Sequence, residues 1–430
     1  MVRLIAPVLF ACMVLLTAPF ARAADPVLAL QAGRVFDSET GRMTGPQLIL
    51  VQGDRILMMG EDLAPPAGAK LINLRAYTVL PGLIESHAHL LMEHPGNEEN
   101  TTTVTKAVTI EGDALRALRG AVRARTYLEA GYTTVRDLGN SGRFADVALK
   151  RAIAEGTVAG PRLFVSGPGL APEGGQVPGL APGQVALIDG EYRIVRGRED
   201  ARQAVREARY HGADLIKMYS NSSPNTTMLS LDEMKAIVEE AHLYKMRVTA
   251  HATNDLAVSR AVEAGVDSIE HAYVVSDATL KEMRCKDVYL VPTDMDLSLA
   301  EKQVRKLNMP LSAAQVAGLA EPYHERLRRA RQAGVMLAAG SDMYMGLGLT
   351  RGQAAKRALF AYAEAGLPTP EILQAATIRG GALLGEAGLG ILAKGTRADI
   401  IAVEGNPIDD LAAIERVVFV MKAGAVVRAP

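Results

Sequence analysis

The sequence predicts an α/β fold in which a (β/α)8 TIM barrel carries a small β-sandwich domain formed by both chain termini. The middle of the 430-residue chain alternates short apolar strands with helical stretches rich in Ala, Arg, Glu and Leu. Both ends instead show short β-type runs between Gly, Asp and Pro turn signals. The length suits one barrel of about 250 to 300 residues plus an accessory domain.

The first residues are typical of a secretory signal peptide, which we expect to span residues 1–23. One arginine precedes an apolar stretch, and Ala21-Arg22-Ala23 forms a small-x-small cleavage site. A membrane anchor is the alternative, but Pro7 and Pro19 interrupt a run that is barely long enough to span a bilayer. We therefore expect a periplasmic or secreted protein that keeps no stable membrane anchor after cleavage.

Both ends of the mature chain have the pattern of β-structure. Between residues 24 and 80, runs such as LALQAGRVF and QLILVQGDRILMMG alternate with turn signals and show no helical period. After residue 390 the same pattern returns in ADIIAVEGNP and RVVFVMKAGAVVR. We expect residues 24–80 and 390–430 to form the two parts of one β-sandwich domain.

Residues 81–389 contain eight strand-then-helix units. Their strands end in the segments GLIESH, YTTVRD, RLFVSG, ADLIKMY, MRVTAH, DSIEH, VYLVPT and VMLAAGSD. Eight such units predict a parallel barrel whose active site lies at the carboxyl ends of the strands. A Gly/Pro-rich insert after the third strand, residues 167–191, is either a lid or pocket wall or a plain surface loop.

The composition is that of a globular protein and argues against one class of partner. Hydrophobic residues make up 49% and charged residues 22% of the chain, and the formal net charge is −1. Because there is no basic excess to attract nucleic acid, we expect no nucleic-acid partner.

Six residues at the ends of five predicted strands suit a metal site. In PGLIESHAHL, His87 and His89 are two positions apart, and alternate residues of a strand point to the same side. Imidazole nitrogen and carboxylate oxygen ligands fit Zn²⁺ or a similar divalent ion. A lysine inside a barrel is costly unless it is paired, has a lowered pKa or is chemically modified, which draws attention to Lys217. The six residues are His87, His89, Lys217, His251, His271 and Asp342.

Three tyrosines are candidates for substrate binding. Tyr219, Tyr273 and Tyr344 lie two residues beyond Lys217, His271 and Asp342, so the same alternation directs their phenols toward the predicted pocket. Packing against neighbouring loops is the alternative. Asp137, at the end of the second strand, is placed either to orient a ligand histidine or to cap the following helix.

The chain resembles the amidohydrolase superfamily, in particular binuclear metal-dependent hydrolases of the imidazolonepropionase-like and Xaa-Pro dipeptidase-like branch, which includes ochratoxin-hydrolysing amidohydrolases. The segments that carry the resemblance span nearly the whole mature chain: PGLIESHAHL, GYTTVRDLG, LIKMY, TAHAT, SIEHAY, GSD and GTRADIIAVEGNP. The resemblance implies two divalent metal ions, with Zn²⁺ expected. It places a carboxylated Lys217 between them, with His87, His89 and Asp342 on one ion and His251 and His271 on the other.

This resemblance implies an amidohydrolase, exported according to its N-terminal pattern, that cleaves an amide, peptide-like bond in a carboxylate-bearing small molecule such as a dipeptide, an N-acyl amino acid or ochratoxin A. A metal-bridged hydroxide would attack the carbonyl, because bound metal lowers the pKa of water to about 7. Asp342 would move the proton to the leaving amine. Asp342, Lys217 and His271 are the expected catalytic residues.

Three alternatives remain open at this point. The same metal centre would serve a lactone, cyclic-amide or phosphotriester hydrolase. A solute- or metal-binding protein without turnover would not need Asp342 as a proton shuttle, and a purely structural subunit would lack an open site. By the resemblance, we also expect a homo-oligomer.

Overall fold

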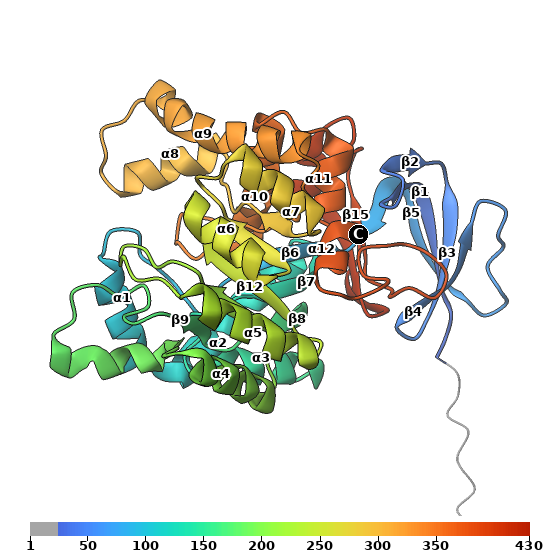
Figure 1. Ribbon diagram of the computed structural model, residues 1–430. Coiled ribbons are helices and arrows are strands. Elements are labelled where there is room, and N and C mark those ends of the chain that lie inside the picture. The colour runs from blue at the N-terminus through green and yellow to red at the C-terminus, as the bar shows by residue number, and fades with distance from the viewer. Residues whose placement is uncertain (1–24) are drawn as a thin grey trace, which may run out of the picture.

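The computed structural model describes residues 25–430, so the signal peptide expected over residues 1–23 lies outside the described range. Figure 1 shows a body of helices surrounding parallel strands, with a separate sheet to one side. Within residues 25–430, every helix is too short or too polar to cross a membrane.

Strands from both chain ends pair in one eight-stranded sheet with the order β17-β16-β15-β5-β1-β3-β4, and β2 pairs with β1. The two ends meet where β15 runs antiparallel to β5, with Ile401 opposite Leu80. Leu30 and Phe419, from opposite ends of the chain, pack in one apolar core. The strands are β1 (Leu28–Asp37), β2 (Arg42–Thr44), β3 (Gln47–Gln52), β4 (Arg55–Gly60), β5 (Lys70–Pro81), β15 (Ile400–Val403), β16 (Val417–Lys422) and β17 (Ala425–Arg428).

The middle of the chain forms parallel strands in two hydrogen-bonded groups. One group has the order β6-β7-β8 and the other β10-β9-β11-β12-β13-β14. The first comprises β6 (Leu83–Ala88), β7 (Tyr132–Asp137) and β8 (Arg162–Val165). The second comprises β9 (Gly169–Ala171), β10 (Tyr192–Ile194), β11 (Leu215–Tyr219), β12 (Arg247–Ala252), β13 (Ser268–His271) and β14 (Tyr289–Val291).

Seven of the eight predicted strands are therefore strands, whereas residues 335–343 form only isolated parallel bridges. These bridges join Leu337 to β14 and Met343 to β6. Two backbone features distinguish this segment from a regular strand. Asp342 has a left-handed backbone with φ 50°, and a Cβ on Gly340 would lie 2.8 Å from the Cβ of His87.

Helices follow the strands in the expected alternation. Ser230 and Glu233 form a capping box at the start of α5, which explains why the helix begins there. The α-helices are α1 (Asn100–Lys106), α2 (Gly112–Glu129), α3 (Ala145–Ala154), α4 (Arg198–His211), α5 (Leu231–Leu243), α6 (Asp255–Ala264), α7 (Asp277–Cys285), α8 (Leu297–Lys306), α9 (Ala313–Gln332), α10 (Arg351–Glu364), α11 (Thr369–Ala375) and α12 (Ile378–Leu383), with other helical turns at η1 (Ala107–Glu111), η2 (Pro182–Gly190) and η3 (Leu411–Glu415).

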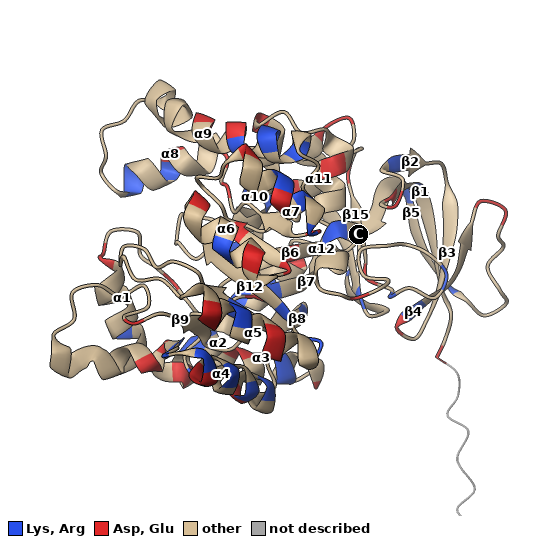
Figure 2. Cartoon of the chain, in the orientation of Figure 1, with Lys and Arg blue, Asp and Glu red and all other residues tan. Residues whose placement is uncertain are grey.

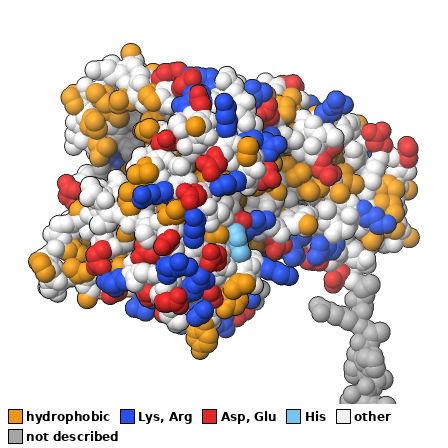
Figure 3. Space-filling model, in the orientation of Figure 1, with side chains coloured by type: hydrophobic (Ala, Val, Ile, Leu, Met, Phe, Trp, Pro, Cys, Tyr) orange, Lys and Arg blue, Asp and Glu red, His pale blue; other side chains and the backbone are white. Residues whose placement is uncertain are grey.

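The outer helices carry charges of both signs. Figure 2 shows basic and acidic residues interspersed along them, and Figure 3 shows both signs and apolar side chains mixed on the displayed face. Exposed pairs such as Arg202 with Glu239, 2.7 Å apart, link neighbouring helices. Because such exposed pairs contribute little, the buried apolar faces of helices and strands supply most of the stability.

Candidate metal centre

A pocket of about 460 Å³ opens at the carboxyl ends of the parallel strands. All nine residues predicted from the sequence for metal, catalytic or substrate roles line it. They are His87, His89, Lys217, Tyr219, His251, His271, Tyr273, Asp342 and Tyr344. The insert after the third strand contributes Gln176 and Tyr192, so it forms part of the pocket wall.

The hydrogen bonds of the first two histidines fix the position of their ring protons. The Nδ1 of His87 lies 2.7 Å from a carboxylate oxygen of Glu270, and that of His89 lies 2.8 Å from the carbonyl oxygen of Gly139. Since these oxygens accept, both Nδ1 atoms donate. When each ring carries only this hydrogen, its lone pair is on Nε2, and the two Nε2 atoms are only 3.3 Å apart. Two lone pairs at this distance repel each other unless a hydrogen or a cation lies between them.

His271 and His251 also offer free ring nitrogens. The Nδ1 of His271 lies 2.7 Å from the hydroxyl of Thr293. Because this hydroxyl gives its one hydrogen to the carbonyl of Pro292, it accepts from Nδ1 of His271. The lone pair of the His271 ring is then on Nε2. The buried Nε2 of His251 has no hydrogen-bond partner among residues 25–430. Burial lowers the pKa of His251 to about 3 and that of His87 to about 4, so both rings are neutral near pH 7.

Asp342 adds an oxygen donor to these nitrogens. Its Oδ1 lies 3.1 Å from Nε2 of His89 and 3.5 Å from Nε2 of His87, yet it makes no hydrogen bond within the described chain. Burial acts to raise the pKa of Asp342, but the positive charge of nearby groups, Lys217 among them, outweighs it and lowers the pKa. Ligand atoms of His87, His271 and Asp342 all lie within 4.8 Å of one another. This mixture of imidazole nitrogen and carboxylate oxygen fits a divalent transition-metal ion.

Lys217 extends from β11 into the same pocket and is only 2% exposed. Burial lowers its pKa to about 8, against the opposing influence of Glu270 and Asp342. A sizeable fraction of the amine is therefore neutral, and hence nucleophilic, at mildly alkaline pH.

Several backbones at the site are left-handed. The φ angles are 75° at His271, 48° at Ala272, 61° at Thr293 and 50° at Asp342. Non-glycine residues rarely adopt such angles, and they concentrate where a site imposes them.

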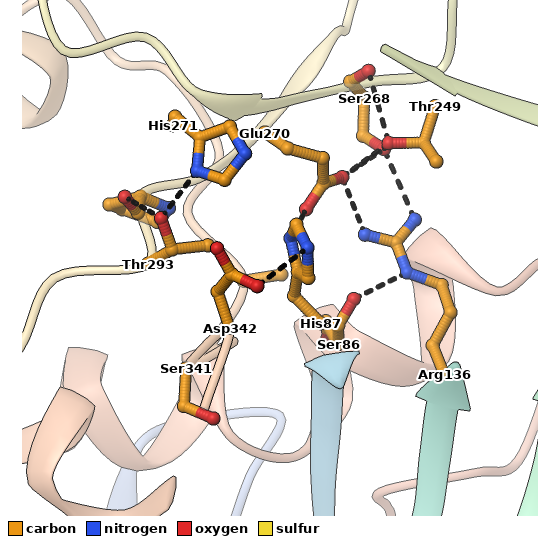
Figure 4. A network of polar contacts seen from close by, with 12 residues as sticks. Ser86, His87, Arg136, Thr249, Ser268, Glu270, His271, Thr293, Ser341 and Asp342 are labelled. Atoms are coloured by element: carbon orange, nitrogen blue, oxygen red, sulfur yellow. Dashed lines mark hydrogen bonds and ion pairs between the residues drawn. The ribbon is translucent and has the colours of Figure 1, made fainter. Parts of the chain in front are cut away.

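Carboxylates beneath the pocket support these side chains, and the sequence did not single them out. Figure 4 shows Glu270 between His87 and Arg136. Glu85 accepts the backbone N–H groups of His87 and Ser341 at 3.1 and 2.7 Å, and burial raises its pKa to about 8. The one available signal was position, since each glutamate lies one or two residues before a predicted ligand histidine.

Asp137 performs neither of its two expected roles. Its carboxylate accepts the backbone N–H of Leu90 at 3.3 Å, so it supports the chain next to His89 rather than a histidine ring. Helix α3 instead begins after Phe144.

The phenols of the pocket are hydrogen-bond donors. Burial raises the pKa of Tyr219, Tyr273 and Tyr344, which keeps all three protonated at physiological pH. The hydroxyl of Tyr219 lies 3.4 Å from the side-chain oxygen of Asn140, whose amide nitrogen donates to Tyr192 at 3.2 Å. Asn140 and Tyr192 thus join the site without a sequence signal.

The chain is similar in sequence and in fold to several known proteins. Residues 78–427 match the model of the amidohydrolase family. Ochratoxinase from Aspergillus niger is 29% identical over 387 residues, which cover 83% of this chain and 77% of the relative. Its crystal structure superimposes with a TM-score of 0.79 at 26% identity, covering 95% of this chain and 97% of the other.

Two further solved structures are similar over most of the chain. A Xaa-Pro dipeptidase with bound methionine in the active site gives a TM-score of 0.80 at 28% identity, and a prolidase complexed with N-methylphosphonate-L-proline gives 0.81 at 30%. Each comparison covers 94% of this chain and 100% of the other. The extent of the family match and the shared fold show that this chain belongs to the amidohydrolase family.

Proposed function

We propose that this protein is a metal-dependent hydrolase that cleaves an amide bond in small carboxylate-bearing molecules, such as dipeptides, N-acyl amino acids or ochratoxin A. The observation that carries the proposal is the pair of Nε2 atoms of His87 and His89, 3.3 Å apart, beside the unbonded Oδ1 of Asp342. The choice of an amide bond rests on the similarity to an ochratoxinase and a Xaa-Pro dipeptidase.

The donor set suits two divalent ions, with Zn²⁺ expected. His87, His89 and Asp342 would hold one ion, and His251 and His271 the other, with a carboxylated Lys217 between them. The lowered pKa of Lys217 supports this modification, in which the neutral amine adds to CO₂, forms an N–C bond and releases one proton. When bound, the ions supply Lewis acidity and a water molecule of lowered pKa.

The chain's own side chains would move the proton and hold the substrate. Asp342 accepts the proton of the attacking water and delivers it to the amine, as the carbonyl carbon gains a C–O bond and loses its C–N bond. Lys217 and His271 fix the position of the reacting centre. The protonated phenols of Tyr219 and Tyr273 line the same space. Tyr273 would donate to a substrate oxygen, and Tyr219 would do so in place of its 3.4 Å contact with Asn140.

The pocket wall favours a second candidate function. Among the described lining residues Lys217 is the one lysine, and there is no arginine. A substrate carboxylate would therefore be bound by neutral donors such as Tyr344, Tyr192 and Asn140 rather than by a guanidinium. Such a wall also accepts an uncharged lactone, cyclic amide or phosphotriester.

We further propose that the chain is exported to the periplasm or secreted and acts as a homo-oligomer. The proposal includes a closed eight-stranded barrel over residues 81–389, supported by the parallel bridges of Leu337 and Met343 to the first and last paired strands. It also includes a β-sandwich formed by residues 24–80 and 390–430, supported by their shared sheet.

The test is hydrolysis of a substrate panel by purified protein beginning at residue 24. Dipeptides, N-acyl amino acids, ochratoxin A, lactones and a phosphotriester are incubated with metal-loaded and chelator-treated protein, and products are measured by mass spectrometry. Chelator-sensitive release of amine from carboxylate-bearing amides is expected. Turnover confined to lactones or phosphotriesters would favour the second candidate function. No hydrolysis of any substrate in the panel would refute both candidate functions.

A further inference from the structure

A fully buried carboxylate lies directly behind the first ligand histidine. Glu270 is on β13, is 0% exposed, and its Oε2 accepts the Nδ1 hydrogen of His87 at 2.7 Å. Figure 4 shows the Glu270 carboxylate above the ring of His87 and Asp342 to the lower left of the ring. A hydrogen on Nδ1 leaves the lone pair of a neutral imidazole on Nε2, the atom that faces His89.

The other oxygen of Glu270 is surrounded by donors. Its Oε1 accepts from Nη2 of Arg136 at 2.7 Å, from the hydroxyl of Ser268 at 3.1 Å and from the hydroxyl of Thr249. Arg136 is itself held in place, because its Nε donates to the backbone oxygen of Ser86 at 2.5 Å. A guanidinium cannot accept a hydrogen bond, so whatever atom stands at this position must be an acceptor.

We propose that Glu270 is a positioning residue that sets the tautomer of His87, with Arg136 fixing the direction in which the carboxylate acts. This inference rests on the proposed metal centre and assigns a role to two residues below it. Through Glu270, the nitrogen that faces the metal is kept free of hydrogen. Partners of this kind orient metal-binding histidines and raise their basicity.

Replacing Glu270 by glutamine reverses this arrangement without changing its shape. The glutamine oxygen must face Arg136, because the guanidinium only donates. The glutamine NH₂ group then faces His87, whose Nδ1 must accept, and the ring hydrogen moves to Nε2. Glu270→Gln should therefore block the metal-binding nitrogen while the backbone stays in place.

Metal affinity of the purified apo-protein tests the proposal. Zn²⁺ is titrated in competition with a chromophoric chelator, and Glu270→Gln is expected to weaken the ion at His87 about 10- to 100-fold. Thr249→Val is the matched control, since it removes one donor to Oε1 and leaves the His87 contact intact. Its affinity should stay within about threefold of the wild type, as expected for a residue without contact to a metal ligand.

A double-variant cycle separates positioning from a general structural role. In a His87→Ala background, Glu270→Gln should have no further effect on Zn²⁺ affinity, because Glu270 acts through the missing ring. An equal loss in that background, or an affinity of Glu270→Gln within threefold of wild type, would overturn the proposal.

Two further readings keep the outcome clear. Circular dichroism of the apo-proteins checks that Glu270→Gln folds. If that variant does not fold, Glu270→Asp replaces it, because the shorter carboxylate keeps the pair with Arg136 but no longer reaches His87. Glu270→Asp should also bind Zn²⁺ more weakly than the wild type. Wild-type affinity in Glu270→Asp would contradict the proposal. A wild type that binds no Zn²⁺ refutes the proposed function together with this inference, whereas a wild type that binds Zn²⁺ as tightly as Glu270→Gln refutes only the role of Glu270.

Discussion

Asp342→Asn removes the proposed proton shuttle and leaves the local structure in place. The backbone at Asp342 is left-handed, with φ 50°, and asparagine is among the few residues that tolerate this region. The amide oxygen of asparagine can occupy the position of Oδ1, 3.1 Å from Nε2 of His89. The change therefore removes a negative charge and a proton acceptor but conserves shape and one oxygen ligand.

The expected loss follows from the proton transfer. General acid/base catalysis contributes a factor of about 10² to 10⁴, which corresponds to about 2.7 to 5.4 kcal/mol of transition-state stabilisation. The loss should appear in kcat, with KM changing little, because Asp342 acts on the attacking water and the leaving amine. Initial rates of amine release and metal content by mass spectrometry are measured on the same preparations.

Asp287→Asn provides a matched control. Asp287 also has a left-handed backbone, with φ 53°, but its side chain is 82% exposed on the surface. This variant should keep wild-type kcat. An Asp342→Asn enzyme that retains its metal and a kcat within tenfold of wild type would refute the assignment of the proton shuttle to Asp342.

Three further outcomes are expected. Arg116→Met leaves Glu191 buried without its ion-pair partner and should lower the free energy of unfolding, measured in urea, by about 3 to 5 kcal/mol. The control Arg125→Met removes one side chain of an exposed pair and should change the free energy of unfolding by less than about 1 kcal/mol. Equal effects of the two variants would contradict this reasoning. Burial lowers the pKa of Lys356 to about 7, so between pH 7 and about 10 the unfolded chain binds more protons than the folded one, and the stability contributed by this site rises with pH. In urea unfolding, Lys356→Met should therefore be most stable relative to the wild type near pH 6, and this advantage should shrink toward pH 10. A difference in stability that does not change with pH would refute the reasoning. Removing metal with a chelator should lower Tm and adding Zn²⁺ should restore it, because an ion bound only to the native state stabilises that state; an unchanged Tm would argue against a metal centre.

The strand-end residues were predictable because parallel strands bring their carboxyl ends together. Alternation along β6 and β11 was enough to direct His87 and Lys217 toward one pocket, and the structure places both there. The regular eighth strand was wrong in detail, because the segment forms only isolated bridges and Asp342 has a left-handed backbone. Periodicity in a sequence does not report a local φ angle.

The alternation of side chains along a strand does not explain why His271 reaches the pocket. Ser268 and Glu270 of β13 both contact Arg136, so they face the interior, and the next residue of a regular strand would face away from it. The φ angle of 75° at His271 turns its side chain back toward His251, with ring centroids 4.5 Å apart. The position of His271 in the sequence was informative, but its direction depended on a backbone angle that only the structure reveals.

The pair of Arg136 and Glu270 could not be predicted from the sequence for a different reason, which also bears on the role of the pair. Barrel interiors are normally filled by layers of branched apolar side chains, and a buried ion pair often adds no stability over apolar residues of the same volume. Stability therefore gives no reason for a fully buried carboxylate at Glu270. Its 2.7 Å contact with His87 does, because a carboxylate whose other oxygen is held by Arg136 can only accept from that ring. The layer of side chains beneath the pocket therefore contains the charged pair of Arg136 and Glu270 at the position where the tautomer of His87 is set.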